Sequence, residues 1–101
     1  MRIMLTAKMC TTKFNAAVRD GSAGMKIKQI MDEIKPEAAY FTEFGGSRTA
    51  VLIVDMPDAS KIPALAEPFF LLFDASVEFR PVMVPADLEK SGIDKIGKKW
   101  T

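Results

Sequence analysis

The run Ala50–Val54 constrains the fold of this chain most, because it has the length of a strand core and is apolar at every position. Successive side chains of a strand point to opposite faces of the sheet. A strand that is apolar on both sides therefore needs cover on both faces. We predict a strand over residues 47–55 with both of its sides covered.

The pair Gly45-Gly46 precedes this strand and follows another strand-like run, residues 37–44. Glycine supplies the positive φ angles that a tight two-residue hairpin turn needs. Such a turn fixes the register and predicts two favourable cross-strand pairs, Glu43 with Arg48 and Thr42 with Thr49. The two runs are therefore predicted to form an antiparallel hairpin.

A strand is also predicted over residues 2–9, where side-chain character alternates with a period of two. The following residues, 13–35, have a helix-compatible composition. Thr11 or Thr12 can cap the start of this helix through its hydroxyl group, and Pro36 ends it.

The apolar stripe of this first helix changes side partway along. At about 100° per residue, the apolar residues up to Met25 and those from Ile27 onward lie on roughly opposite sides. Gly21, Ser22 and Gly24 are weak helix formers, so a break among them would let both halves face one core. The alternative is one straight helix that a partner buries on its second side.

A second helix is predicted over residues 62–73, opened by Asp58 or Ser60. Pro63 and Pro68 set limits to it, since a proline inside a helix removes one hydrogen bond and clashes with the preceding turn. We expect a bent or two-piece helix.

Residues 76–84 alternate as a strand, and Pro81 is tolerated best on an edge strand because it cannot donate to a neighbour. A short third helix is predicted to begin at Pro85. The last residues, 93–101, show little periodicity and are interpreted as a C-terminal tail, which Trp100 anchors to its own surface or to a partner.

This order of elements predicts an α+β fold. The order β-α-β-β-α-β is that of a ferredoxin-like protomer, with a four-stranded antiparallel sheet and both helices on one face. At 101 residues the chain has room for a single domain, residues 1–101. The other face of the sheet is then free, and a second copy packed face to face would cover it. We predict a homodimer.

Composition excludes several classes of function. The 14 Lys and Arg residues are balanced by 13 Asp and Glu residues and are scattered through the chain, which predicts no nucleic-acid partner and no membrane partner. No apolar run approaches the roughly 20 residues that span a bilayer. Met1–Cys10 is interpreted as a strand and not as a signal peptide.

Cys10 is the single cysteine, and the chain has no histidine. One thiol cannot form an internal disulfide, a zinc cluster or a redox pair, which points to a reducing cytoplasm. Cys10 is expected to be an inert, small apolar residue. Without histidine the chain lacks the usual general base and the commonest metal ligand, so we predict no metal and no cofactor.

Three segments resemble an uncharacterised bacterial family of the dimeric α/β-barrel superfamily: Pro36–Gly46, Ile62–Phe70 and Val77–Met83. The resemblance covers nearly the whole chain. It implies a ferredoxin-like protomer whose sheet pairs with that of its twin into a barrel. Cofactor-free monooxygenases, muconolactone isomerases, stress-response barrels and pure binding domains share this architecture. The histidines and paired tryptophans that many of them use are missing here, so no catalytic residue carries over.

Tyr40 is the single tyrosine, and its phenol could orient a carbonyl-bearing ligand or act as an acid. The rings of Phe69, Phe70 and Phe73 are dense enough to line an apolar pocket between sheet and helices. These four residues are the candidate ligand-binding site. The structural alternative is that they fill a small core and satisfy a strand preference.

Thr6, Glu78 and Arg80 are the candidate polar residues of a barrel interior. Glu78 and Arg80 share one face of their predicted strand, as Thr6 and Lys8 share one face of the adjacent strand. The alternative is an ion-pair network at the dimer interface that sets its register.

Two classes of function fit these residues. The first is a homodimeric domain that binds a small, partly apolar metabolite, and the second is a cofactor-free enzyme of the isomerase or monooxygenase type. Without histidine a catalyst would depend on Tyr40, Glu43, Glu78 or Arg80 in a desolvated pocket. Binding requires only a cavity, and is the function we predict.

Overall fold

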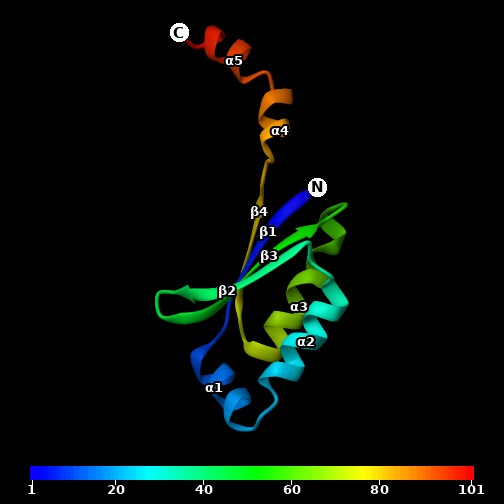
Figure 1. Ribbon diagram of the computed structural model, residues 1–101, viewed down its shortest axis with the longest axis vertical. Helices are drawn as coiled ribbons and strands as arrows, with labels where there is room; N and C mark the ends of the chain where they lie inside the picture. The colour runs from blue at the N-terminus through cyan, green and yellow to red at the C-terminus, as the bar shows by residue number, and fades with distance from the viewer.

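Four antiparallel strands form one sheet in the order β2-β3-β1-β4 (Figure 1). The computed structural model describes residues 1–101 and confirms an α+β fold with ferredoxin-like strand order. The strands are β1 Arg2–Lys8, β2 Ala38–Phe44, β3 Ser47–Asp55 and β4 Ser76–Pro81. The helices are α1 Thr11–Arg19, α2 Ala23–Ile34, the 3₁₀ turn η1 Ala59–Lys61, α3 Ile62–Phe73, α4 Pro85–Lys90 and α5 Ile93–Lys99.

The hairpin of β2 and β3 has the predicted register. Glu43 lies opposite Arg48 and Thr42 opposite Thr49. Gly45 and Gly46 both have positive φ angles, 58° and 82°, which only glycine adopts at little cost. The turn is closed further by the Glu43 carboxylate, which accepts a 2.8 Å hydrogen bond from the Gly46 N–H.

The hydrophobic core lies between the sheet and helices α1 to α3. Leu5 of β1 and Leu52 of β3 are directly opposite each other and fully buried. From the helices, Phe69 and Phe73 are buried against them, and Phe14 of α1 stacks on Phe73 with ring centroids 4.9 Å apart. One face of the sheet is therefore covered by helices and the other carries none.

The first predicted helix is interrupted, as the change of side in its apolar stripe indicates. Helix α1 ends at Arg19 and α2 begins at Ala23, so both halves turn an apolar side to the core. Gly21 lies in the break with a φ of 81°. Helix α1 starts after Cys10 and has no side-chain cap, so neither of the two threonines acts as the predicted cap.

Gly21 and Gly24 form a matched pair for testing the break. We expect Gly21→Ala to lower the free energy of unfolding by about 1 to 2 kcal/mol, because an L side chain is strained at positive φ. Gly24 lies inside α2 with open space around an added methyl group. Gly24→Ala should therefore raise it by up to about 1 kcal/mol. Urea unfolding measures both, and equal effects of the two substitutions would contradict this account.

Helix α3 is one uninterrupted helix, so of the two predicted forms, bent or two-piece, the two-piece form is wrong. Pro63 sits in its first turn, where the missing N–H has no partner to lose. Pro68 lies inside the helix, which continues to Phe73 around it. Asp58 caps the turn η1 through a 2.9 Å hydrogen bond from the Ser60 N–H.

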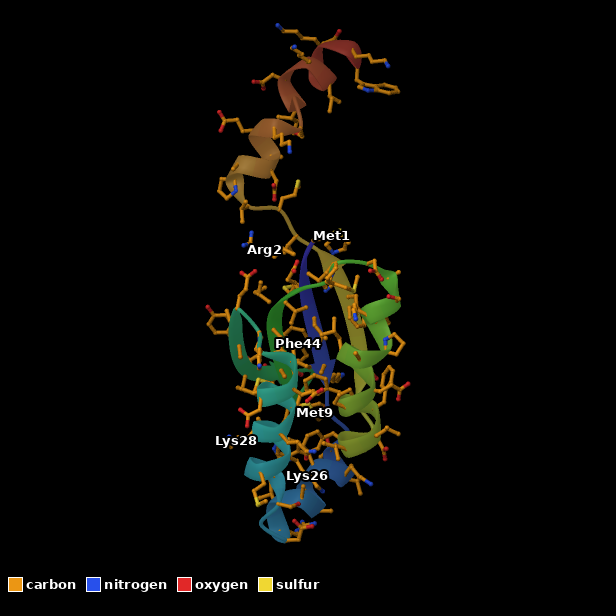
Figure 2. The ribbon with its side chains drawn as sticks, turned by 90° about the vertical axis from the view of Figure 1, so that its right-hand side faces the viewer. Met1, Arg2, Met9, Lys26, Lys28 and Phe44 are labelled. Atoms are coloured by element: carbon orange, nitrogen blue, oxygen red, sulfur yellow. The ribbon has the colours of Figure 1, made fainter.

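Strand β4 is an edge strand, as Pro81 indicates, and ends there, before the predicted end at residue 84. The short helix predicted to begin at Pro85 is confirmed as α4. A further helix, α5, forms within the segment that was interpreted as a tail of little periodicity. Both helices extend away from the sheet and from the other helices (Figures 1 and 2).

Candidate functional site

The helix-free face of the sheet carries the candidate polar residues in neighbouring rows. In the pairing of the strands, Tyr40 lies opposite Val51, Val51 opposite Thr6, and Thr6 opposite Glu78. Leu5 and Leu52, one residue along, point to the core. Because strand side chains alternate between faces, this whole row lies on the face without helices.

The next row toward the N-terminus of β1 is mainly apolar. It contains Ala38, Ile53, Met4 and Arg80 in register. Met4, Ile53 and Val51 are partly exposed, and Tyr40 is 63% exposed. Together these residues form an apolar area at the centre of a sheet surface that nothing in the chain covers.

The row on the other side of Tyr40 is polar. It contains Thr42, Thr49, Lys8 and Ser76. The side chain of Lys8 crosses the sheet toward the hairpin turn, since its Nζ lies 3.4 Å from where a Cβ on Gly45 would be. Its ammonium group has no carboxylate partner among the ion pairs of the structure. The hydroxyl groups of Thr42 and Ser76 are exposed in this row, whereas Thr49 is buried and its hydroxyl donates to the Ser47 carbonyl. The polar end of the face therefore carries one free cation beside two exposed hydroxyl groups.

Glu78 and Arg80 form an ion pair with each other. Arg80 Nη2 lies 3.1 Å from Glu78 Oε2, and both side chains are more than half exposed. An exposed pair of this kind contributes little to stability, and it holds the charges of both groups together at the edge strand. Neither group is left as a free, desolvated acid or base.

The candidate phenylalanines lie on the other side of the sheet from Tyr40. Phe69 and Phe73 are buried in the core, and Phe70 is 38% exposed on the outer side of α3. The pocket expected between Tyr40 and these rings does not form, because the register of β2 turns Tyr40 to the helix-free face. None of the surface hollows is lined by any of the four residues.

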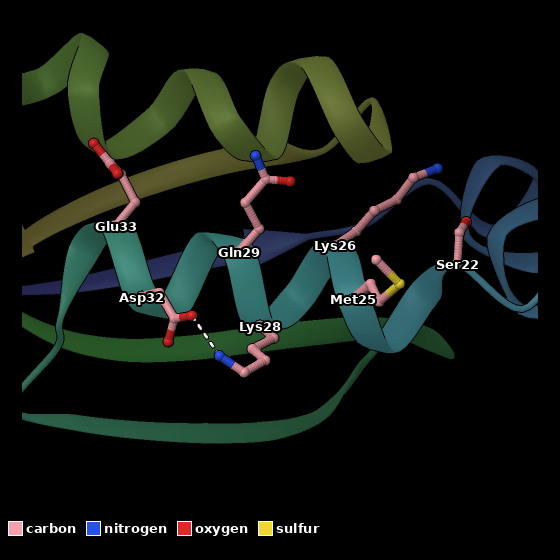
Figure 3. Close-up of a pocket in the computed structure, with 7 residues that line it drawn as sticks. All are labelled: Ser22, Met25, Lys26, Lys28, Gln29, Asp32 and Glu33. Carbon is pink, nitrogen blue, oxygen red and sulfur yellow. Dashed lines mark hydrogen bonds and ion pairs between the residues drawn. The ribbon is translucent and has the colours of Figure 1, made fainter.

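The largest hollow, about 600 Å³, follows helix α2 (Figure 3). Gln29 and Glu33 point toward α3, whereas Asp32 points away and pairs with Lys28 at 2.5 Å. Met25 is the one apolar residue that lines it. Its side chains project from successive turns of one helix without converging on a point, so we assign no binding site to it.

Other groups with candidate chemistry lie apart from the helix-free face. The pKa of the Asp58 carboxyl is lowered by hydrogen bonds from the Ser60 hydroxyl and the Ser60 N–H, which is the effect of a cap before α3. Cys10 is partly buried between β1 and α1. No group of three or more His, Cys, Asp or Glu side chains is placed to hold a metal ion. None of the helices combines the length and apolar character needed to cross a bilayer.

Fold and surface together define an α+β domain of ferredoxin-like strand order with one uncovered sheet face. No protein-family model matches the chain, and no curated protein matches it. The sequence predicts Thr6, Glu78 and Arg80 as candidate site residues. It also predicts Tyr40, but beside the phenylalanines of α3, which lie on the other side of the sheet. Met4 and Ile53 were not assigned to the site, but the period of two in β1 and the hairpin register locate both of them on this face.

Proposed function

We propose that this protein is a homodimer whose helix-free sheet faces meet and enclose a binding site for a small, partly apolar carboxylate. The observation that carries the proposal is the division of this face into an apolar half and a polar half with an unpaired lysine. The resemblance to the dimeric α/β-barrel superfamily supports the same pairing of sheets.

The apolar half supports the choice of a second copy as its cover. Ile53, Met4 and Val51 are exposed in part at the centre of the sheet, next to Tyr40. Burying an exposed side chain of this size stabilises by about 1.5 to 3 kcal/mol, and these half-buried side chains would contribute a part of that when they become fully enclosed. A second helix-free face is itself apolar at its centre, and a twofold axis brings like surfaces together.

The polar half supports a carboxylate as the ligand's head group. Lys8 carries a positive charge that no side chain of the chain neutralises, and Thr42, Thr49 and Ser76 lie in its row. Once two sheets close over it, an ammonium group needs a counter-charge, because an unpaired charge is costly out of water. A ligand carboxylate supplies this charge, and its apolar body lies on the other half.

Binding is favoured over catalysis by the state of the titratable groups. Glu78, the one carboxylate in the row of Tyr40, is paired with Arg80. A general acid or base must be free to exchange a proton with a bound ligand, and Glu78 is instead held in an exposed ion pair. Recognition of a ligand requires only the shape and the charge that the face carries.

Titration with matched ligands tests the site. We expect hexanoate and phenylacetate to bind in isothermal calorimetry, and 2-hexanone, of similar shape but without charge, to bind less tightly. Lys8→Met should weaken the carboxylates roughly tenfold or more, because it removes a charge-assisted hydrogen bond worth about 1.5 to 3 kcal/mol. Tyr40→Phe should weaken binding by about 0.5 to 1.5 kcal/mol, the value of one neutral hydrogen bond.

Lys13→Met is the matched control, since it removes an exposed lysine from α1 on the other side of the sheet. This variant should bind all three probes like the wild type. Equal loss of affinity in both lysine variants would mean that the effect comes from the net charge of the protein and not from a contact with Lys8. If none of the probes binds the wild type, the carboxylate site is refuted.

A further inference from the structure

The residues after β4 are separate from the rest of the molecule. We call residues 82–101 the C-terminal arm. None of them is buried, and one hydrogen bond, from the Val82 N–H to the Arg2 carbonyl at 3.2 Å, joins the arm to the sheet. The arm makes the molecule 58 Å long, with a radius of gyration of 16.9 Å. A compact chain of this length has about 13 Å.

Helix α5 in the arm has an apolar stripe without a partner. Ile93 and Ile96 are three residues apart and lie on one side of the helix, and Trp100 follows directly after its last residue. Their exposed fractions are 52%, 50% and 78%. Lys98 and Lys99 adjoin this stripe at the C-terminal end of the helix, so the apolar side has a basic border.

A groove of about 450 Å³ between α2 and α3 has the complementary character. Its apolar part includes Ile30, Leu71 and Leu72, and Leu71 is 72% exposed. Two acidic residues line it, Glu33 from α2 and Glu67 from α3. Neither carboxylate has an ion-pair partner in the structure. Figure 3 shows Glu33 pointing toward α3 across this groove.

We propose that helix α5 of one chain docks into the α2–α3 groove of a second copy. The apolar stripe would cover Leu71 and Leu72, and Lys98 and Lys99 would meet Glu33 and Glu67. Helix α5 is short enough to fit, since it is about 10 Å long and the part of α3 that lines the groove is about 15 Å long. Helix-in-groove recognition of this kind uses an apolar stripe for affinity and flanking charges for orientation.

A second copy is the occupant because the arm leaves its own body. Both views show α4 and α5 beyond the end of the sheet at which the N-terminus lies, away from α2 and α3 of the same chain (Figures 1 and 2). Apart from the Val82 hydrogen bond, all backbone hydrogen bonds of the arm are internal to it. This inference does not rest on the sheet-face dimer, which involves other residues.

Disulfide trapping between two different full-length chains tests the docking. One chain carries Cys10→Ser with Ile96→Cys in α5, and the other carries Cys10→Ser with Ala64→Cys in the groove. After mild oxidation of the mixture, we expect a covalent heterodimer of the two chains. Glu33→Lys with Glu67→Lys in the groove chain should lower its yield about fivefold, and Lys98→Glu with Lys99→Glu in the arm chain should restore it.

Two control variants test whether trapping is specific to the groove and whether it occurs between two chains. Lys13→Cys in place of Ala64→Cys puts the thiol on α1, outside the groove, and should give little heterodimer. A chain carrying both Ile96→Cys and Ala64→Cys reports docking within one chain as a cross-linked monomer. That product without a heterodimer in the mixture would overturn the proposal, as would equal trapping at the Lys13 and Ala64 positions.

Discussion

Phe69→Ala is expected to lower the free energy of unfolding by about 3 to 5 kcal/mol, the usual loss for a large aromatic side chain removed from a core. Phe69 is 1% exposed in the layer between α3 and the sheet. The substitution removes the burial of the ring and leaves a cavity that the neighbouring Leu5 and Leu52 only partly fill. For a domain of ordinary stability, this loss is a large part of the total.

Phe70→Ala on the same helix is the matched control for this prediction. Its ring is 38% exposed and faces away from the core, so we expect a loss of about 1 kcal/mol. Urea unfolding of the two variants and the wild type gives the comparison. Equal losses would mean that α3 does not present the side described here to the sheet.

Lysine at neighbouring positions of β3 is expected to have opposite consequences. Leu52→Lys should prevent folding or cost at least about 4 kcal/mol, because it buries an unpaired charge in the core. Ile53→Lys puts the charge on the helix-free face, where water solvates the ammonium group of a single chain. We expect the folded monomer to survive and the homodimer to dissociate, through repulsion and lost apolar contact.

Circular dichroism and light scattering separate these two outcomes. Circular dichroism should show a native spectrum for Ile53→Lys and a disordered one for Leu52→Lys. Light scattering of Ile53→Lys, combined with Glu33→Lys and Glu67→Lys to oppose the docking of α5, should give the mass of a single chain. A dimer of this combined variant would show that the helix-free face is not the interface.

Local patterns in the sequence predicted the parts of the fold that local physics decides. The glycine pair fixed the hairpin register because two residues with positive φ leave one geometry for a tight turn. The change of side in the first helix predicted its break because both halves need the same core. Pro81 predicted an edge strand because it lacks an N–H to donate.

The sequence of β3 does not determine on which face of the sheet Tyr40 lies. Val51 and Leu52 are both apolar, so the sequence leaves open which of them faces the helices and which lies beside Tyr40. The same ambiguity produced the expected pocket with the phenylalanines of α3. The alternation of side chains along each strand places Thr6 on the same face as Lys8, and Glu78 on the same face as Arg80. This holds whichever face of the sheet the helices cover.

The C-terminal arm could not be predicted because its helices are short and carry no core signal of their own. Helix α5 has seven residues, fewer than an isolated helix needs for stability in water. Its apolar stripe is meaningful only beside a surface that buries it. The sequence predicts that Trp100 anchors the tail to its own surface or to a partner. Its side chain is 78% exposed, so it does not anchor the tail to its own chain.

The mass in solution of a chain carrying Glu33→Lys and Glu67→Lys, which opposes the docking of α5, tests the central claim most directly. Light scattering at micromolar concentration should give twice the chain mass of 11.1 kDa, because the apolar half of the helix-free face requires cover. On dilution, the mass should fall to that of one chain once the protein concentration is below the dissociation constant of the dimer. A mass of one chain throughout the micromolar range would contradict the pairing of the sheets and the enclosed site built on it.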